Sequence, residues 1–106
     1  MENFMDIKTL ADYEKAIQNR CIILVTATWC PDCVFIKPFI GEVAKENPEF
    51  TYYKIDRDEM LDLCKDMDVL GIPSFVAYDN GKEIGRFVSK DRKTRAEIES
   101  FIQSLK

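Results

Sequence analysis

The feature that most constrains the fold is an uninterrupted apolar run that leads directly into a pair of cysteines. Residues 21–27 read Cys-Ile-Ile-Leu-Val-Thr-Ala, without alternation of polar and apolar side chains. Such a run is typical of a strand that is buried on both faces of a sheet. It is followed by Trp29-Cys30-Pro31-Asp32-Cys33, after which apolar residues recur at helical spacing until Asn47-Pro48. We therefore expect a central strand and a helix that begins at the cysteine pair.

Periodicity and turn signals predict the other elements. Capping boxes at Thr9 and Thr94 open amphipathic helices, and Asp79-Asn80-Gly81 is a hairpin turn between antiparallel strands. Pro38 lies inside the second helix, where its missing N–H predicts a kink. The predicted helices cover residues 10–20, 30–47, 58–67 and 94–105, and the predicted strands cover residues 21–27, 50–56, 74–78 and 83–88. This order indicates an α/β fold with a central mixed sheet and helices on both faces.

Length and composition indicate a single domain spanning residues 1–106. The chain is 46% hydrophobic and 32% charged, which is enough apolar material for one core. The net charge is -4, and the basic residues are scattered among acidic ones, so we expect no nucleic-acid binding. No apolar run is long enough to cross a bilayer, and the first residues lack the features of a secretory signal. These observations predict a cytoplasmic protein that does not bind membranes.

The two cysteines at the predicted junction of strand and helix carry the chemistry. Unpaired N–H groups and the positive dipole end of a helix stabilise a thiolate at its N-terminus. Cys30, at the helix mouth, is the predicted exposed nucleophile, and Cys33, one turn further, is the predicted resolving thiol. Trp29 is expected to add an exposed aromatic surface. Histidine is absent from the chain, which excludes cysteine–histidine and serine–histidine–aspartate catalysis.

A metal site is the alternative for a pair of this spacing. Zinc or an iron–sulfur cluster needs further ligands, and Cys21 and Cys64 form no second close pair in the sequence. We expect both to be small buried hydrophobic residues, with a redox role for Cys64 left open. We therefore expect a dithiol with no bound metal or cofactor.

The whole chain resembles the thioredoxin family. The resemblance rests on Cys21 through Cys33, on Pro38, on Gly71-Ile72-Pro73-Ser74 and on the turn at Asn80-Gly81. It implies the thioredoxin fold and a cis peptide bond before Pro73, which would face the cysteine pair. It also implies that the backbone of Ile72 pairs with a substrate strand, flanked by Trp29 and Pro31. A strand-opening proline is the plainer interpretation of Pro73.

Several positions depart from the family pattern. Pro31-Asp32 stands where typical thioredoxins have Gly-Pro, which is similar to a smaller group of cytosolic thioredoxin-related proteins with a narrower substrate range. We expect the Asp32 carboxylate to oppose thiolate formation and so to make the dithiol more reducing. Leu24 and Tyr52 replace the buried aspartate and the lysine that assist proton transfer in typical members, so Asp32 is a candidate proton acceptor for Cys33, or only a helix-end carboxylate. Ser89 replaces an expected glycine.

The resemblance implies a thiol–disulfide oxidoreductase that reduces protein or small-molecule disulfides through a Cys30–Cys33 dithiol cycle. Its electrons would come from a thioredoxin reductase or from a small thiol. A binding module with the same fold and little turnover is the alternative, since a fold does not determine a function. A glutathione-dependent enzyme is less well supported, because no Gly-Gly turn follows the last strand.

Overall fold

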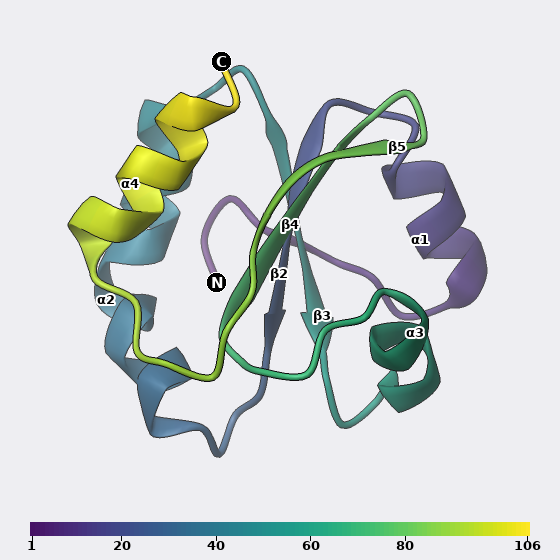
Figure 1. The fold of residues 1–106 in the computed structure, drawn as a ribbon, viewed down its shortest axis with the longest axis horizontal. Coiled ribbons are helices and arrows are strands. Elements are labelled where there is room, and N and C mark those ends of the chain that lie inside the picture. The colour runs from purple at the N-terminus through teal and green to yellow at the C-terminus, as the bar shows by residue number, and fades with distance from the viewer.

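The computed structural model describes residues 1–106 and contains one five-stranded mixed sheet with four helices (Figure 1). The strand order is β1-β3-β2-β4-β5. In chain order the elements are β1 (Met5–Asp6), α1 (Leu10–Ala16), β2 (Cys21–Thr26), α2 (Pro31–Glu46), β3 (Thr51–Asp56), α3 (Leu61–Asp66), β4 (Ser74–Asp79), β5 (Lys82–Phe87) and α4 (Arg95–Ser104).

Strand β2 is the centre of the sheet, as its apolar run predicts. It pairs in parallel with β3 and antiparallel with β4, and the side chains from Cys21 to Val25 are fully buried. Alternate residues enter two separate hydrophobic clusters. Ile23 packs with the residues of α1 and α3, whereas Leu24 packs with those of α2 and α4. The sheet therefore separates two cores, with α2 and α4 on one side and α1 and α3 on the other (Figure 1).

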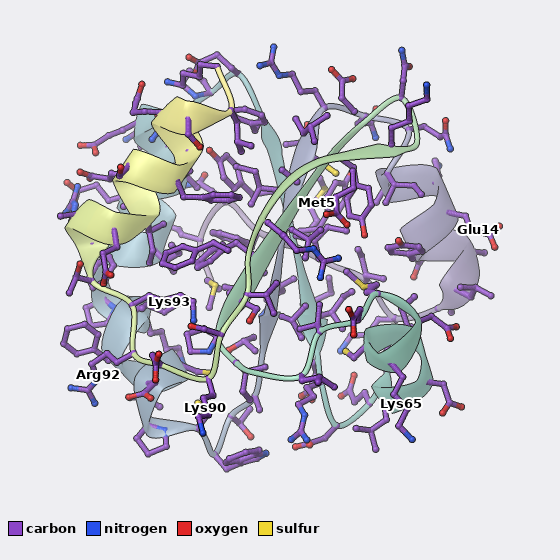
Figure 2. All side chains as sticks on the ribbon, viewed as in Figure 1. Met5, Glu14, Lys65, Lys90, Arg92 and Lys93 are labelled. Atoms are coloured by element: carbon purple, nitrogen blue, oxygen red, sulfur yellow. The ribbon has the colours of Figure 1, made fainter.

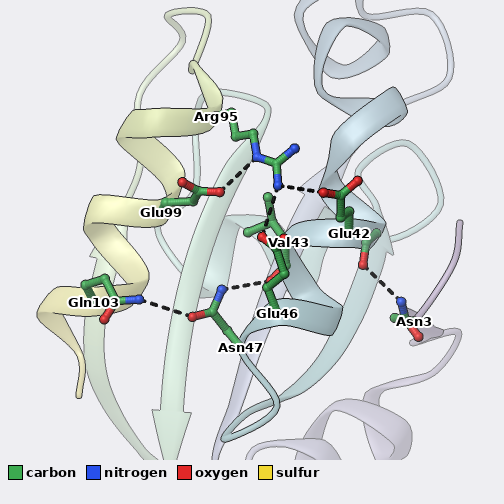
Figure 3. Close-up of polar contacts among 9 residues, drawn as sticks. Asn3, Glu42, Val43, Glu46, Asn47, Arg95, Glu99 and Gln103 are labelled. Carbon is green, nitrogen blue, oxygen red and sulfur yellow. Dashed lines mark hydrogen bonds and ion pairs between the residues drawn. The ribbon is translucent and has the colours of Figure 1, made fainter.

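Helices α2 and α4 are also joined at their outer surface (Figure 3). The Arg95 guanidinium lies 3.1 Å from a Glu42 carboxylate oxygen and 3.0 Å from one of Glu46, and it bonds Glu99 on its own helix. Asn47 is the C-cap of α2, and its side-chain oxygen accepts a hydrogen bond from the Gln103 amide at 3.3 Å. These polar contacts close over the apolar cluster beneath the two helices. No helix in the chain is both long enough and apolar enough to cross a membrane.

The hairpin and the two capping boxes are confirmed. Asn80 and Gly81 have φ of 54° and 80°, the left-handed pair that a two-residue turn of type I′ requires. The hydroxyls of Thr9 and Thr94 accept hydrogen bonds from backbone N–H groups three residues on. Helix α2 continues through Pro38 as one element, and the kink at that residue stays a prediction.

Two predicted helix boundaries are wrong. The first helix ends at Ala16 rather than near Arg20, because the carbonyl of Ile17 accepts from Gly81 of the hairpin. The third begins at Leu61 rather than at residue 58, because the Asp56 carboxylate accepts from the backbone N–H groups that follow it and forms a turn.

The edge strand β1 was not among the predicted elements. Only Met5 and Asp6 belong to it, and they pair with Tyr53 and Lys54 of β3. Two exposed residues are too few to show an alternation of polar and apolar side chains, so only the pairing with β3 identifies this strand.

The segment before β4 is packed against the segment after β5. A Cβ on Gly71 would lie 2.4 Å from the carbonyl carbon of Ser89, so only glycine fits there. The buried Ser74 hydroxyl donates to the Gly71 carbonyl at 2.6 Å and lies 3.5 Å from the Ser89 carbonyl oxygen. These contacts hold the Ile72-Pro73 turn against the loop that leads into α4.

We predict that Gly71→Ala lowers the free energy of unfolding by about 1–3 kcal/mol, because a backbone segment must move to admit the new methyl group. Gly85→Ala is the matched control. Its Cβ would meet the terminal methyl group of Leu105 at 2.5 Å, and a flexible side chain can rotate away. Urea denaturation of both variants measures the difference. Equal losses would contradict a specific contact between Gly71 and Ser89.

Candidate active site

The cysteine pair lies at the junction between the end of β2 and the start of α2. Cys30 is the N-cap of the helix, and its Sγ accepts the backbone N–H of Cys33 at 3.3 Å. Pro31 occupies the first turn, where its missing N–H costs no hydrogen bond. A sulfur at an N-cap receives the unpaired N–H groups of the first turn and the positive end of the helix dipole. The arrangement favours negative charge on Cys30.

The prediction that Cys30 is exposed is wrong. Cys30 is 5% exposed and Cys33 is 4% exposed, and both are free thiols. The reason is the turn before β4, which the sequence places far from the motif. The Cys30 thiol donates to the carbonyl of Ile72 at 3.9 Å, so this turn lies over the sulfur. The two thiols therefore differ in electrostatics and not in access.

Cys33 is hard to ionise. Burial, together with a smaller contribution from the neighbouring Cys30 side chain, raises the pKa of Cys33 to about 11. Cys33 consequently needs a group that assists its deprotonation before it can act as a nucleophile. This is consistent with its predicted role as the resolving thiol, which attacks after Cys30.

The peptide bond between Ile72 and Pro73 is cis, as the family resemblance implies. It immediately precedes β4, whose first residue Ser74 pairs with Val25 next to the end of β2. The sheet register therefore brings this turn to the same end of the molecule as the cysteine pair. Ile72 is 9% exposed and its carbonyl is the oxygen that faces Cys30.

Trp29 forms an exposed aromatic surface beside the pair, as predicted. Its side chain is 59% exposed, and the indole N–H donates to the Asp58 carboxylate at 2.6 Å. The Arg57 guanidinium lies 5.9 Å from the centre of the ring. These contacts fix the orientation of the indole ring, and more than half of the side chain stays exposed.

Asp32 has a partner that the sequence did not reveal. The Arg92 Nε lies 2.8 Å from the Asp32 carboxylate, and the same guanidinium stacks over Phe35 at 4.4 Å. Arg92 belongs to the loop between β5 and α4, sixty residues further along the chain. The ion pair compensates part of the charge that we expected to act on the thiols. Arg92 lies in a run of mixed charges, and nothing in that run indicates that it pairs with Asp32.

The next residue, Lys93, points the other way (Figure 2). Its side chain is 1% exposed, and its ammonium donates to two atoms of Ser89 and to the carbonyl of Asp91. Burial lowers the pKa of Lys93, and the nearby carboxylates of Asp91 and Asp32 act on it in the opposite direction. A lysine in a charged run is ordinarily solvated, so sequence reasoning missed a buried cation near the pair.

The remaining predicted positions are buried in the core. Cys21 and Cys64 are free and are 0% and 2% exposed, as small hydrophobic residues would be. Leu24 is fully buried, and the Tyr52 hydroxyl donates to the carbonyl of Asn47. No group of three or more ligand side chains gathers anywhere in the structure. Neither Leu24 nor Tyr52 supplies an ionisable group to the thiols.

Comparisons with known proteins agree with this geometry. The family model described as thioredoxin matches residues 5–104. The chain is 32% identical over 83 residues to thioredoxin-1 of Saccharomyces cerevisiae, covering 76% of this chain and 81% of the relative. It is 35% identical over 92 residues to a thioredoxin of Geodia cydonium, covering 83% and 85%.

Solved structures give the same answer for the fold. The X-ray structure of Fasciola hepatica thioredoxin superposes with a TM-score of 0.84 at 29% identity, covering 97% of this chain and all of that one. A thioredoxin from Trypanosoma brucei brucei superposes with a TM-score of 0.85 at 19% identity, covering 96% and 89%.

A dithiol at a helix N-terminus, facing a cis-proline turn, defines a protein of the thiol–disulfide exchange class. The chain belongs to the thioredoxin family. Family and fold together support thiol–disulfide oxidoreductase chemistry in general.

We predict that the two thiols are alkylated at different rates in the reduced protein despite their equal burial. Cys30 reacts first because the helix N-terminus favours its charge, whereas Cys33 gains reactivity only as the pH rises toward about 11. Mass spectrometry after timed iodoacetamide labelling measures both rates. Similar rates at neutral pH would contradict the assignment of roles.

The ion pair at Asp32 predicts opposite shifts for its two residues. Arg92→Gln leaves the carboxylate uncompensated and makes the dithiol more reducing, whereas Asp32→Asn makes it more oxidising. Both side chains are partly exposed, so each shift is below about 20 mV. Asp32→Asn is expected to have a larger effect in the Arg92→Gln background than alone. Equilibration with dithiothreitol buffers measures the potentials, and identical effects in both backgrounds would show that the pair is uncoupled.

Proposed function

We propose that this protein is a cytoplasmic reductant of disulfides that works through a Cys30–Cys33 dithiol cycle. The observation that carries the proposal is the Cys30 sulfur, which caps α2, accepts the N–H of Cys33 and lies under the Ile72 carbonyl. Cys30 attacks a substrate disulfide and forms a mixed disulfide. Cys33 then attacks Cys30, releases the reduced substrate and leaves a Cys30–Cys33 disulfide.

The surroundings of the pair suit a disulfide in an extended segment. The backbone of Ile72 is the proposed partner of a substrate strand, with Trp29 and Pro31 on either side of it. Trp29 is 59% exposed, and Leu70, just before the turn, is 81% exposed. Exposed apolar side chains beside a reactive thiol support docking of protein or small-molecule disulfides.

Regeneration of the dithiol needs an electron donor. A thioredoxin reductase or a small thiol is the proposed donor, and the cycle itself requires no bound cofactor. The second candidate is a binding module with little turnover, which Leu24 and Tyr52 favour because they remove the usual proton-transfer groups. Two free thiols within one helical turn favour the redox cycle over this alternative.

We predict that the reduced protein cleaves the disulfides of insulin with dithiothreitol as donor, and that Cys30→Ser abolishes this activity. Cys33→Ser is expected to lose turnover while still forming mixed disulfides, because the second attack is removed. The precipitation of reduced insulin measures turnover, and gel mobility without reductant detects the trapped complexes. Cys64→Ala is the matched control, since this buried thiol lies outside the motif.

A normal reduction potential without turnover on any disulfide would favour the binding module. Activity that survives in Cys30→Ser would contradict the proposed nucleophile. Complexes trapped by Cys33→Ser in a lysate can then be identified, and they name the substrates directly.

A further inference from the structure

The loop between β5 and α4 contains a lysine side chain that is removed from water. Lys93 is 1% exposed, whereas Lys90 and Arg92 of the same loop extend into solvent (Figure 2). A lysine is almost never fully buried unless its ammonium finds partners in the protein. The contacts of Lys93 therefore show what its burial achieves.

The ammonium of Lys93 has three N–H groups, and three oxygen atoms of its own loop accept them. These are the carbonyl of Ser89 at 3.0 Å, the hydroxyl of Ser89 at 3.1 Å and the carbonyl of Asp91 at 2.9 Å. The ammonium also lies 5.2 Å from the centre of the Phe87 ring. All three acceptors are neutral, so the cation is held by hydrogen bonds and by an aromatic face. Lys93 thus joins the end of β5 and the loop after it to the start of α4.

Ser89 is the residue at which this loop meets the Ile72-Pro73 turn. A Cβ on Gly71 would lie 2.4 Å from the carbonyl carbon of Ser89, and the Ser74 hydroxyl lies 3.5 Å from the Ser89 carbonyl oxygen. Gly71 and Ser74 flank the turn on its two sides. Both ends of the turn therefore pack on the residue that Lys93 holds.

The Ser89 hydroxyl gives a purpose to one departure from the family pattern. It accepts the Lys93 ammonium and, at 3.3 Å, the backbone N–H of Asp91. The glycine expected at this position has no hydroxyl and would leave one N–H of the buried ammonium without an acceptor, which is costly. The serine and the buried lysine therefore depend on each other.

The same loop carries Arg92, the residue before Lys93. The Arg92 Nε lies 2.8 Å from the carboxylate of Asp32, between the two cysteines of the motif. Lys93 points into the protein, and Arg92 leaves the loop on the side of α2. A displacement of the loop would consequently affect both the turn over Cys30 and the ion pair at Asp32.

We propose that Lys93 is a positioning residue for disulfide substrates, whose ammonium fixes Ser89 and, through Ser89, the turn that receives the substrate strand. The proposal rests on the dithiol cycle proposed above. The Ile72 carbonyl lies 3.9 Å from the Cys30 sulfur, so a small shift of the turn changes where a bound disulfide meets the nucleophile. Lys93 acts through the turn, since its ammonium donates to loop oxygens and to neither thiol.

The test separates substrate binding from chemistry. Lys93→Met keeps an unbranched side chain of similar length and removes the three N–H groups. We expect it to raise KM for the reduction of insulin about fivefold, the effect of about one lost hydrogen bond to the substrate strand, with kcat changed by less than about twofold. Hydroxyethyl disulfide is too small to pair with the turn, so its reduction is expected at the wild-type rate. Rates over a range of insulin concentrations, with dithiothreitol as donor, measure KM and kcat.

Ile102→Val is the matched control for a loss of stability. Ile102 is 1% exposed in the cluster between α2 and α4, and the loss of one methyl group destabilises the protein without a change in the loop. Urea denaturation measures the stability of both variants. An unchanged KM in Lys93→Met, or an equal rise of KM in Ile102→Val, would overturn the positioning role.

Ser89→Ala provides a second variant in case Lys93→Met does not fold. It removes one of the three acceptors of the ammonium and is expected to raise KM for insulin about twofold. A KM equal to that of the wild type would again overturn the proposal. Failure of the wild type to reduce both insulin and hydroxyethyl disulfide would instead refute the dithiol cycle itself.

Discussion

The burial of β2 on both faces is the constraint on which the rest of the structure depends. A strand whose first five side chains are all apolar and buried must be covered above and below, so helices are required on both sides of the sheet. The strand must also end where the helices no longer cover its two faces. The chain leaves the sheet after Thr26, and α2 begins five residues later with Cys30 as its cap. The reactive pair is therefore a consequence of how the central strand stops.

Pairing of β2 with β4 brings the second half of the site into position. The antiparallel register places Ser74 opposite Val25, so the Ile72-Pro73 turn arrives at the end of β2 next to the cysteines. The loop after β5 then contacts both halves, since Ser89 packs on Gly71 and Arg92 pairs with Asp32. One short segment thus links the helix that carries the thiols to the turn that covers them.

Local signals in the sequence predict most of the fold and the identity of the thiols. The apolar run, the capping boxes at Thr9 and Thr94 and the turn at Asn80-Gly81 each depend on neighbouring residues, and each is confirmed. Apart from the start of α3, which the local turn at Asp56 delays, what failed depends on contacts between distant segments. The cover over Cys30 comes from Ile72, and the partner of Asp32 comes from the loop before α4.

Lys93 illustrates a further limit of sequence reasoning. Its place in a run of charges indicates only a solvated side chain, and the folded loop alone removes it from water. The environment of this residue therefore depends on tertiary contacts that its sequence neighbours do not reveal.

The division of the interior into two clusters has a consequence for how this protein can change. Cys30, Cys33 and Ile72 all belong to the cluster under α1 and α3, whereas the body of α2 packs with α4 in the other. Substitutions in separate clusters share few contacts and act nearly independently. Side chains in the cluster between α2 and α4 can therefore change, by evolution or by engineering, with little effect on the thiols. Side chains in the cluster under α1 and α3 are more constrained, because they share that cluster with Cys30, Cys33 and Ile72.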